Sequence, residues 1–209
     1  MPTSLQIGFY GILTDPYVGY EQLTRVMVEK HVRIIQLRMK DVADSAVLNM
    51  ARKLRPIIPA ETKFIINDNP QIALECGADG VHLGQTDMTY AEARKLLGPE
   101  AIIGLSTHNP QQTRDACALL PDYIGIGPVY ATPTKKIADP VLGISGMQQM
   151  LALATVPAVC LGGIDHDNVD AVLEGGATNI CAVRCINASH QPEVELDRML
   201  ARLRAQNRN

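Results

Sequence analysis

The chain has 209 residues, of which 46% are hydrophobic and 20% charged, and its formal net charge at pH 7 is −3. It contains no basic run and few aromatic residues (Tyr 6, Phe 2, Trp 0), which argues against a nucleic-acid-binding surface. No apolar run reaches membrane-spanning length, and Met1–Leu13 lacks the pattern of a secretory signal. We therefore expect a cytoplasmic protein that folds as one domain over residues 1–209. The five cysteines are scattered through apolar runs, which predicts reduced, buried thiols.

Eight short apolar segments are predicted to be strands buried on both faces. In chain order they are Ile7–Thr14, Val32–Arg38, Lys63–Asn67, Gly80–Leu83, Ala101–Leu105, Tyr123–Gly127, Ala158–Leu161 and Asn179–Val183. Between them the apolar spacing changes to three and four residues, which is typical of helices. Thr89 and Glu92 form a capping box before a helix that stops at Gly98, and Asn69-Pro70 opens a helix that Gly77 closes.

Eight strands alternating with eight helices predict an α/β fold of the (β/α)8 TIM-barrel type. A doubly wound open sheet is the competing architecture. Such a sheet normally has a glycine-rich phosphate loop after its first strand, where this chain has Leu13-Thr14-Asp15-Pro16. The barrel is therefore the favoured fold.

Polar residues follow nearly every predicted strand, and in a barrel these positions meet at the rim that carries the active site. On an extended strand, Gln36, Arg38 and Lys40 share one face. An amide, a guanidinium and an ammonium at one place suit a cluster of anionic oxygens. The alternative is that both cations simply reach solvent at the end of the strand.

Two carboxylates, Asp68 and Asp87, follow neighbouring predicted strands and are expected to approach each other. Near a bound phosphate, such a pair suits Mg²⁺, which takes one or two protein carboxylates together with phosphate oxygens and water. The alternative is that each aspartate only shapes a turn.

A second anion site is predicted from Gly162-Gly163 and Val183-Arg184, whose backbone N–H groups come after the last two strands. The long segment 127–143 is either a lid, in which Lys135 reaches a phosphate, or a variable surface loop. His82 and His108 are expected to be hydrogen-bonded structural histidines, and Tyr10 and Tyr123 to be packing residues. Two anion sites on one rim suit one bis-phosphorylated substrate or two phosphorylated substrates.

These motifs, taken together, resemble those of the thiamine-phosphate synthases over nearly the whole chain. They are Gln-Leu-Arg-Met-Lys (36–40), Asn-Asp (67–68), Gly-Ala-Asp-Gly-Val-His-Leu-Gly-Gln-Thr-Asp (77–87), Gly-Leu-Ser-Thr-His (104–108), Gly-Pro-Val-Tyr-Ala-Thr-Pro-Thr-Lys (127–135) and Gly-Gly-Ile (162–164). The resemblance implies a barrel enzyme that joins hydroxymethylpyrimidine diphosphate to a thiazole phosphate. In that family, diphosphate leaves first and the thiazole nitrogen captures the resulting pyrimidine cation.

Carried over residue by residue, the resemblance implies three groups of site residues. The pyrimidine diphosphate would be held by Gln36, Leu37, Arg38, Met39, Lys40, Asn67, Ser106 and Lys135. Of these, the residues implied to act in catalysis are Arg38, Ser106 and Lys135. The thiazole phosphate would be contacted by Thr132, Pro133, Thr134, Gly163, Val183 and Arg184. Asp68 and Asp87 would hold Mg²⁺ as the cofactor.

Arg184 stands where the family usually has serine. If backbone amides do most of the binding, Arg184 adds a charge-assisted contact to the thiazole phosphate; if the hydroxyl matters, the affinity falls. Three rival functions are a thiazole tautomerase, which usually has a catalytic histidine at the position of Pro128, a Schiff-base aldolase acting through Lys40, and a non-catalytic regulator of thiamine metabolism. A homo-oligomer and a side activity on an altered thiazole stay open.

Overall fold

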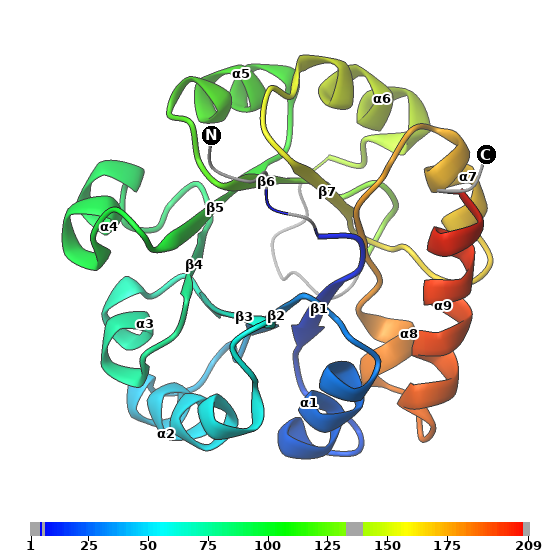
Figure 1. Ribbon diagram of the computed structural model, residues 1–209. Coiled ribbons are helices and arrows are strands. Elements are labelled where there is room, and N and C mark those ends of the chain that lie inside the picture. Colours follow the sequence, from blue (N-terminus) through cyan, green and yellow to red (C-terminus); the bar gives the residue numbers. More distant parts are fainter. Residues whose placement is uncertain (1–4, 6, 133–139, 207–209) are drawn as a thin grey trace.

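A computed structural model describes residues 5, 7–132 and 140–206. Eight parallel strands succeed one another in chain order around a nearly closed barrel, and helices surround it (Figure 1). The strands are β1 (Tyr10–Leu13), β2 (Ile34–Leu37), β3 (Lys63–Asn67), β4 (Gly80–Leu83), β5 (Ile102–Thr107), β6 (Tyr123–Ile126), β7 (Ala158–Leu161) and β8 (Ile180–Cys181). A bridge between Phe9 and Ile180 joins the last strand to the first. The predicted TIM-barrel fold is confirmed.

The strands divide their side chains between two cores because successive residues point to opposite faces. In β2, Ile35 and Leu37 belong to the large core between the barrel and its helices. Ile34 belongs to the smaller core that fills the barrel interior, together with Tyr10 and Tyr123. The continuous apolar character of the strands is a consequence of this double burial.

The helices have the caps that the sequence predicts. Asn69 accepts a hydrogen bond from the N–H of Ile72, and Gly77 ends that helix in the left-handed conformation. Thr89 and Glu92 form a capping box. In chain order the helices are α1 (Tyr20–Glu29), α2 (Asp44–Leu54), the short 3-10 helix Arg55–Ile57, α3 (Pro70–Cys76), α4 (Tyr90–Leu97), α5 (Pro110–Ala118), α6 (Gly143–Leu153), α7 (Val169–Glu174), α8 (Arg184–Asn187) and α9 (Pro192–Gln206).

The prediction of eight helices was wrong by one among the residues that the structure describes. The extra helix, α8, is a single turn inserted between β8 and the final helix α9. Buried Asn187 ties it to the barrel: its side chain accepts from the N–H of Thr14 and donates to the carbonyls of Ile12 and Val183, each at 2.8 to 3.0 Å. These bonds hold the segment after β8 against the end of β1.

Arginine side chains fasten the other end of the barrel, where the strands begin. Arg55 reaches Asp79, just before β4, and the same carboxylate accepts the N–H of Phe64 in β3. Arg94 reaches Asp122, just before β6, and donates to the carbonyl of Ala101, just before β5. These contacts serve stability, because active sites of TIM barrels lie at the opposite end.

The cysteines agree with the expectation from composition. The five cysteines are free thiols, and four of them are buried. Burial raises the pKa of the Cys185 thiol, the partly exposed one, to about 11, so that it stays protonated. Within the described ranges, no helix is long and apolar enough to cross a lipid bilayer.

Candidate active site at the carboxyl ends of the strands

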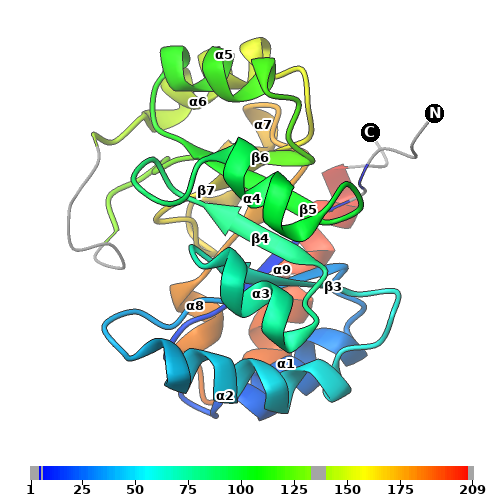
Figure 2. The same cartoon turned by 90° about the vertical axis from the view of Figure 1, so that its left-hand side faces the viewer.

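The carboxyl ends of the strands gather polar side chains at one rim of the barrel. In Figure 2, β4 points toward the side on which α8 and the loop leading into α2 lie. Gln36 and Leu37 end β2 on this side, and Asn67 ends β3, where it pairs in register with His82 of β4. The site is therefore supported by adjacent parallel strands, as in other TIM barrels.

The segment after β2 departs from the predicted geometry. The strand ends at Leu37, so Gln36, Arg38 and Lys40 do not share the face of one continuous strand. Gln36 is buried, Arg38 is partly buried, and Lys40 is exposed. Lys40 is nevertheless brought to the site, because its ammonium forms an ion pair with the carboxylate of Asp68.

The side chains of Leu37 and Met39, unlike those of their polar neighbours, pack in the apolar core. The Leu37 side chain is fully buried in the core between barrel and helices, and Met39 packs partly against the same core. Contact of Leu37 with a ligand at the rim would therefore come from its backbone. Its side chain serves to fix the strand end that carries Gln36 and Arg38.

Asp68 and Asp87 lie next to each other, as predicted. Asp68 adopts a left-handed backbone conformation, with φ of 65°, and its N–H donates to the carbonyl of His82 at 2.8 Å. Asp87 accepts the N–H of Gly84 at 2.6 Å, which folds the loop after β4 back toward the barrel. A non-glycine residue with positive φ costs roughly 1–3 kcal/mol and is often found at functional sites.

The two carboxylates influence each other electrostatically. Burial raises the pKa of Asp87, and the neighbouring carboxylate of Asp68 raises it further, while Lys40 opposes the shift. A divalent cation placed between the two aspartates would relieve this repulsion. Two carboxylates form too small a set to enclose an ion, and no cluster of three or more His, Cys, Asp or Glu ligands occurs in the described parts of the chain. The pair fits Mg²⁺ that completes its shell with phosphate oxygens and water.

Arg38 adds a cation beside these acids. Burial lowers the pKa of its guanidinium, and the carboxylates of Asp68, Asp15 and Asp41 counteract this shift. An arginine remains charged under such conditions. Its charge is thus held near Asp68 in a partly desolvated place, where contacts with anionic oxygens are stronger than in open water.

A hydrogen-bonded chain of side chains crosses the barrel interior beneath the rim. Gln36 Nε2 donates to Tyr10 Oη at 2.8 Å, and Tyr10 Oη lies 2.6 Å from Tyr123 Oη. His82 Nδ1 lies 3.0 Å from Tyr123 Oη, and its Nε2 lies 2.9 Å from Ser106 Oγ. We refer to these five residues as the buried relay. Burial lowers the pKa of His82 to about 4, so its ring is neutral at pH 7.

The two histidines and the two tyrosines of this region are all hydrogen-bonded. His82 and His108 are hydrogen-bonded, as predicted; His108 Nδ1 lies 2.6 Å from the carbonyl oxygen of Gly127. Tyr10 and Tyr123 do pack in the interior core, but their hydroxyls also connect Gln36 to His82, which sequence reasoning missed. The feature of the sequence that reflects this arrangement is the glycine at position 104. A Cβ there would lie 2.1 Å from Cζ of Tyr123, so no larger residue fits beside the tyrosine.

The second predicted anion site lies after β7. Gly162 and Gly163 have φ of 97° and 64°, a conformation that glycine adopts without strain. Their carbonyl oxygens accept from Tyr130 N–H and Asn168 Nδ2, at 2.9 and 2.8 Å. Their own N–H groups donate no hydrogen bond within the described chain. Successive unused N–H groups in such turns form an anion-binding concavity.

The structure describes only some of the other residues that are predicted to contact phosphate. Val183 precedes α8 and Arg184 is its exposed first residue. Thr132 is partly exposed and lies beyond Tyr130, the residue that bonds to Gly162. Pro133, Thr134 and Lys135 lie outside the described residues. Ser106 is in place at the rim, where its carbonyl oxygen accepts from Gln85 Nε2 at 2.6 Å.

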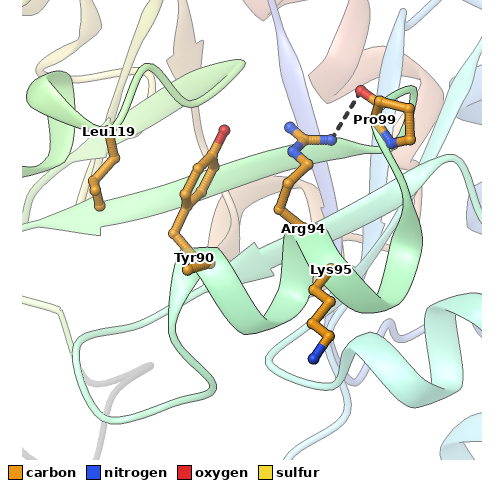
Figure 3. A pocket seen from close by; sticks show the side chains of 6 residues that line it. Tyr90, Arg94, Lys95, Pro99 and Leu119 are labelled. Carbon is orange, nitrogen blue, oxygen red and sulfur yellow. Dashed lines mark hydrogen bonds between the residues drawn. The ribbon is translucent and has the colours of Figure 1, made fainter.

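A pocket on the outer surface is separate from this rim. It is lined by Tyr90, Ala91, Arg94, Lys95, Pro99 and Leu119 (Figure 3). Arg94 within it is occupied by hydrogen bonds to the carbonyls of Gly98, Pro99 and Ala101. The pocket therefore lies on the outer surface beside α4 and is not part of the candidate active site.

Comparisons with known proteins identify the family of the chain. Residues 12–186 match the thiamine monophosphate synthase family. The thiamine-phosphate synthase of Chlamydia caviae is 36% identical over 186 residues, which cover 87% of this chain and 88% of that protein. That of Gloeobacter violaceus is 41% identical over 182 residues, covering 87% of this chain and 53% of that protein.

The chain is shorter than some of these relatives. It spans between 53% and 56% of the length of the synthases from Gloeobacter violaceus, Synechocystis sp. and Nostoc sp.. The solved structure of thiamine phosphate pyrophosphorylase from Pyrococcus furiosus superimposes with a TM-score of 0.84 at 25% identity, covering 96% of both chains. The match extends over the strands that carry the rim residues, and the chain belongs to the thiamine monophosphate synthase family.

Proposed function

We propose that this chain is a thiamine-phosphate synthase, which joins a pyrimidinylmethyl diphosphate to a thiazole phosphate and releases diphosphate. The observation that carries the proposal is the meeting of Asp68, Asp87, Lys40 and Arg38 at one rim. Paired carboxylates with flanking cations fit a departing diphosphate bound together with a metal ion. The relatives of comparable length carry this name.

The reaction breaks one C–O bond and forms one C–N bond. The electron pair of the C–O bond leaves with the diphosphate oxygen, and the exocyclic carbon of the pyrimidine becomes cationic. The lone pair of the thiazole nitrogen then forms the new bond, so no proton has to be removed from the nucleophile. This chemistry is consistent with a site that presents cations and hydrogen-bond donors, since the protein has to orient two substrates and stabilise the leaving group.

The residues that would hold Mg²⁺ are Asp68 and Asp87. Bound there, the ion would neutralise charge on the departing diphosphate oxygens. Lys40, which pairs with Asp68, and Arg38 would contact the same diphosphate. Lys135 is proposed to join them from the segment after β6, as the family resemblance implies.

The thiazole phosphate is proposed to bind at the N–H groups of Gly162-Gly163 and of the turn that begins at Val183. Thr132, Pro133 and Thr134 are proposed to complete this site, as the resemblance implies. The two phosphate groups would then be held by different strands of one rim. This separation leaves the pyrimidine carbon and the thiazole nitrogen to meet between them.

Arg184 is expected to strengthen thiazole phosphate binding at this site. Replacing it with alanine should raise the KM for the thiazole phosphate by about 5- to 10-fold, because one charge-assisted hydrogen bond is lost. The kcat should change little. Steady-state kinetics would measure both, and the exposed Arg198→Ala variant, which loses only an ion pair with Glu195 on α9, is the matched control. An unchanged KM in Arg184→Ala would show that backbone amides alone bind the phosphate.

The proposed activity is tested by a turnover assay with both phosphorylated substrates. Formation of thiamine phosphate and diphosphate in equal amounts, with Mg²⁺ and not with a chelator, is the expected result. If no product forms although the protein is folded and binds both ligands, the regulator becomes the better interpretation. If neither ligand binds, the proposal is wrong.

A further inference from the structure

The number of hydrogens in the buried relay limits the directions that its hydrogen bonds can take. Tyr10 and Tyr123 each carry one hydroxyl hydrogen, and a neutral imidazole carries one N–H and one acceptor nitrogen. Both tyrosines are almost fully buried, at 2% and 1% exposure, so each hydroxyl hydrogen needs an acceptor within the relay. This requirement links the hydrogen-bond direction at Gln36 to that at Ser106.

Only two arrangements use every buried hydrogen and also place one hydrogen in each of the four contacts. In the first, Gln36 Nε2 donates to Tyr10, Tyr10 to Tyr123, Tyr123 to His82 Nδ1, and His82 Nε2–H to Ser106. In the second, every bond is reversed: Ser106 donates to His82 Nε2, His82 Nδ1–H to Tyr123, Tyr123 to Tyr10, and Tyr10 to the amide oxygen of Gln36. Any mixed arrangement either leaves a buried hydroxyl hydrogen without an acceptor, which costs about 1–3 kcal/mol, or places two acceptor atoms face to face with no hydrogen between them, such as the two tyrosine oxygens at 2.6 Å.

The amide of Gln36 decides between them. Its Nε2 donates to Tyr10 at 2.8 Å, which belongs to the first arrangement. Its Oε1 accepts no hydrogen bond from the described residues, and it is not sealed from solvent. Oε1 is therefore reachable from solvent, as an acceptor.

The end of the relay at Ser106 agrees with this direction. Ser106 Oγ receives the N–H of His82 in the first arrangement, so its own hydrogen is free to be donated at the rim. A diphosphate oxygen only accepts hydrogen bonds, and a donated hydroxyl hydrogen suits it. In the second arrangement the same hydrogen would point away from the anion, toward His82.

We propose that Tyr10, Tyr123 and His82 are positioning residues that lock Gln36 as an acceptor and Ser106 as a donor, and so select a pyrimidine bearing an amino group over one bearing a ring carbonyl. The inference rests on the proposed function for its substrate, and it adds to that function the origin of the selectivity. An amino group donates to Gln36 Oε1, whereas a ring carbonyl would face another oxygen. The relay opposes rotation of the Gln36 amide to accommodate the carbonyl. Such a rotation either reverses all four bonds and turns the Ser106 hydrogen away from the diphosphate, or leaves the two tyrosine oxygens 2.6 Å apart with no hydrogen between them.

Two features show that the relay is built into the fold. Gly104 leaves the space for the tip of Tyr123, since a Cβ there would lie 2.5 Å from Oη. The His82 and Tyr123 rings are stacked with centroids 5.4 Å apart and an interplanar angle of 25°. Both constraints fix the hydroxyl of Tyr123 where it reaches Tyr10 and His82 together.

The direction of the relay is tested without substrate. Long-range ¹H–¹⁵N spectra of the full chain, labelled at histidine, report which ring nitrogen carries hydrogen. We expect His82 to carry it on Nε2, whereas His108 should carry it on Nδ1, because Nδ1 faces the carbonyl oxygen of Gly127. A His82→Gln variant identifies the His82 signals. Hydrogen on Nδ1 of His82 would overturn the proposal.

The selectivity is tested with the Tyr10→Phe variant, which keeps the ring but removes the hydroxyl that holds Gln36. The substrates are the aminopyrimidine diphosphate and its analogue with a ring carbonyl in place of the amino group. We expect the ratio of their kcat/KM values to fall about tenfold, the equivalent of roughly one hydrogen bond. The KM for the thiazole phosphate should not change. Tyr90→Phe, which removes a hydroxyl on the exposed helix α4, should leave the ratio unaltered.

The outcomes separate this inference from the proposed function. If the wild-type chain turns over neither pyrimidine, the proposed function fails, and the proposed selectivity fails with it. If the wild-type chain is active but Tyr10→Phe, with an unchanged melting temperature, keeps the wild-type ratio, the positioning role is wrong. If Tyr10→Phe does not fold, Tyr123→Phe replaces it, because removal of that hydroxyl interrupts the relay at its centre and should also lower the ratio.

Discussion

Replacing Asp68 with asparagine is expected to lower kcat/KM about 100-fold or more at a fixed Mg²⁺ concentration. The substitution removes one of the two carboxylates proposed to bind the metal, and with it the partner of Lys40. Loss of metal stabilisation of a departing diphosphate is worth several kcal/mol, and each 1.36 kcal/mol corresponds to a factor of ten in rate. Part of the activity should return at high Mg²⁺, since Asp87 remains. Steady-state kinetics over a Mg²⁺ titration would measure both effects.

The control for this experiment is a carboxylate of the same type away from the rim. Asp115 is exposed on α5, where it accepts a hydrogen bond from Gln111. Its exchange for asparagine should leave the kinetics and their Mg²⁺ dependence unchanged. If Asp68→Asn retained the wild-type rate and the wild-type Mg²⁺ dependence, the assignment of the metal site to Asp68 and Asp87 would be wrong.

Replacing Gly163 with alanine is expected to have the second large effect, a rise of at least about tenfold in the KM for the thiazole phosphate. Its φ of 64° strains an alanine, and a Cβ would lie 2.6 Å from the carbonyl oxygen of Ala131 and 2.8 Å from Cβ of Tyr130. The segment from 128 to 132 has to move, and the proposed phosphate contacts move with it. Displacement of a bound group by about 1 Å can cost a factor of 100 in rate.

Gly77 provides a closely matched comparison. Its φ is 66°, but nothing lies within 4 Å of an added Cβ, and it ends α3, which leads into the start of β4. Gly77→Ala should therefore lose about 1–2 kcal/mol of unfolding free energy from backbone strain alone, with unchanged kinetics. Thermal unfolding and the KM for the thiazole phosphate would be measured for both variants. Equal kinetics in the two would show that Gly163 does not support the phosphate site.

The sequence by itself determined the elements whose causes are local. Strands β3, β4 and β7 have the predicted bounds, because short apolar runs with helical spacing between them specify buried parallel strands. The caps at Asn69 and Thr89 are confirmed, because a cap depends on side chains within three residues. The neighbourhood of Asp68 and Asp87 was also predictable, since consecutive strands of a barrel are adjacent and their ends share one rim.

Only the tertiary structure decided where β2 ends, which element comes after β8, and how the interior polar groups pair. The β2 strand stops at Leu37, although the sequence predicted a strand to Arg38 and an extended segment with Gln36, Arg38 and Lys40 on one face. Helix α8 exists where Asn187 bonds to Ile12 and Thr14, more than 170 positions away in the chain. Tyr10 and Tyr123 are 113 residues apart, and only closure of the barrel brings their hydroxyls to 2.6 Å. Pairings of this kind depend on the whole topology, because each tyrosine alone has the pattern of an ordinary buried aromatic residue.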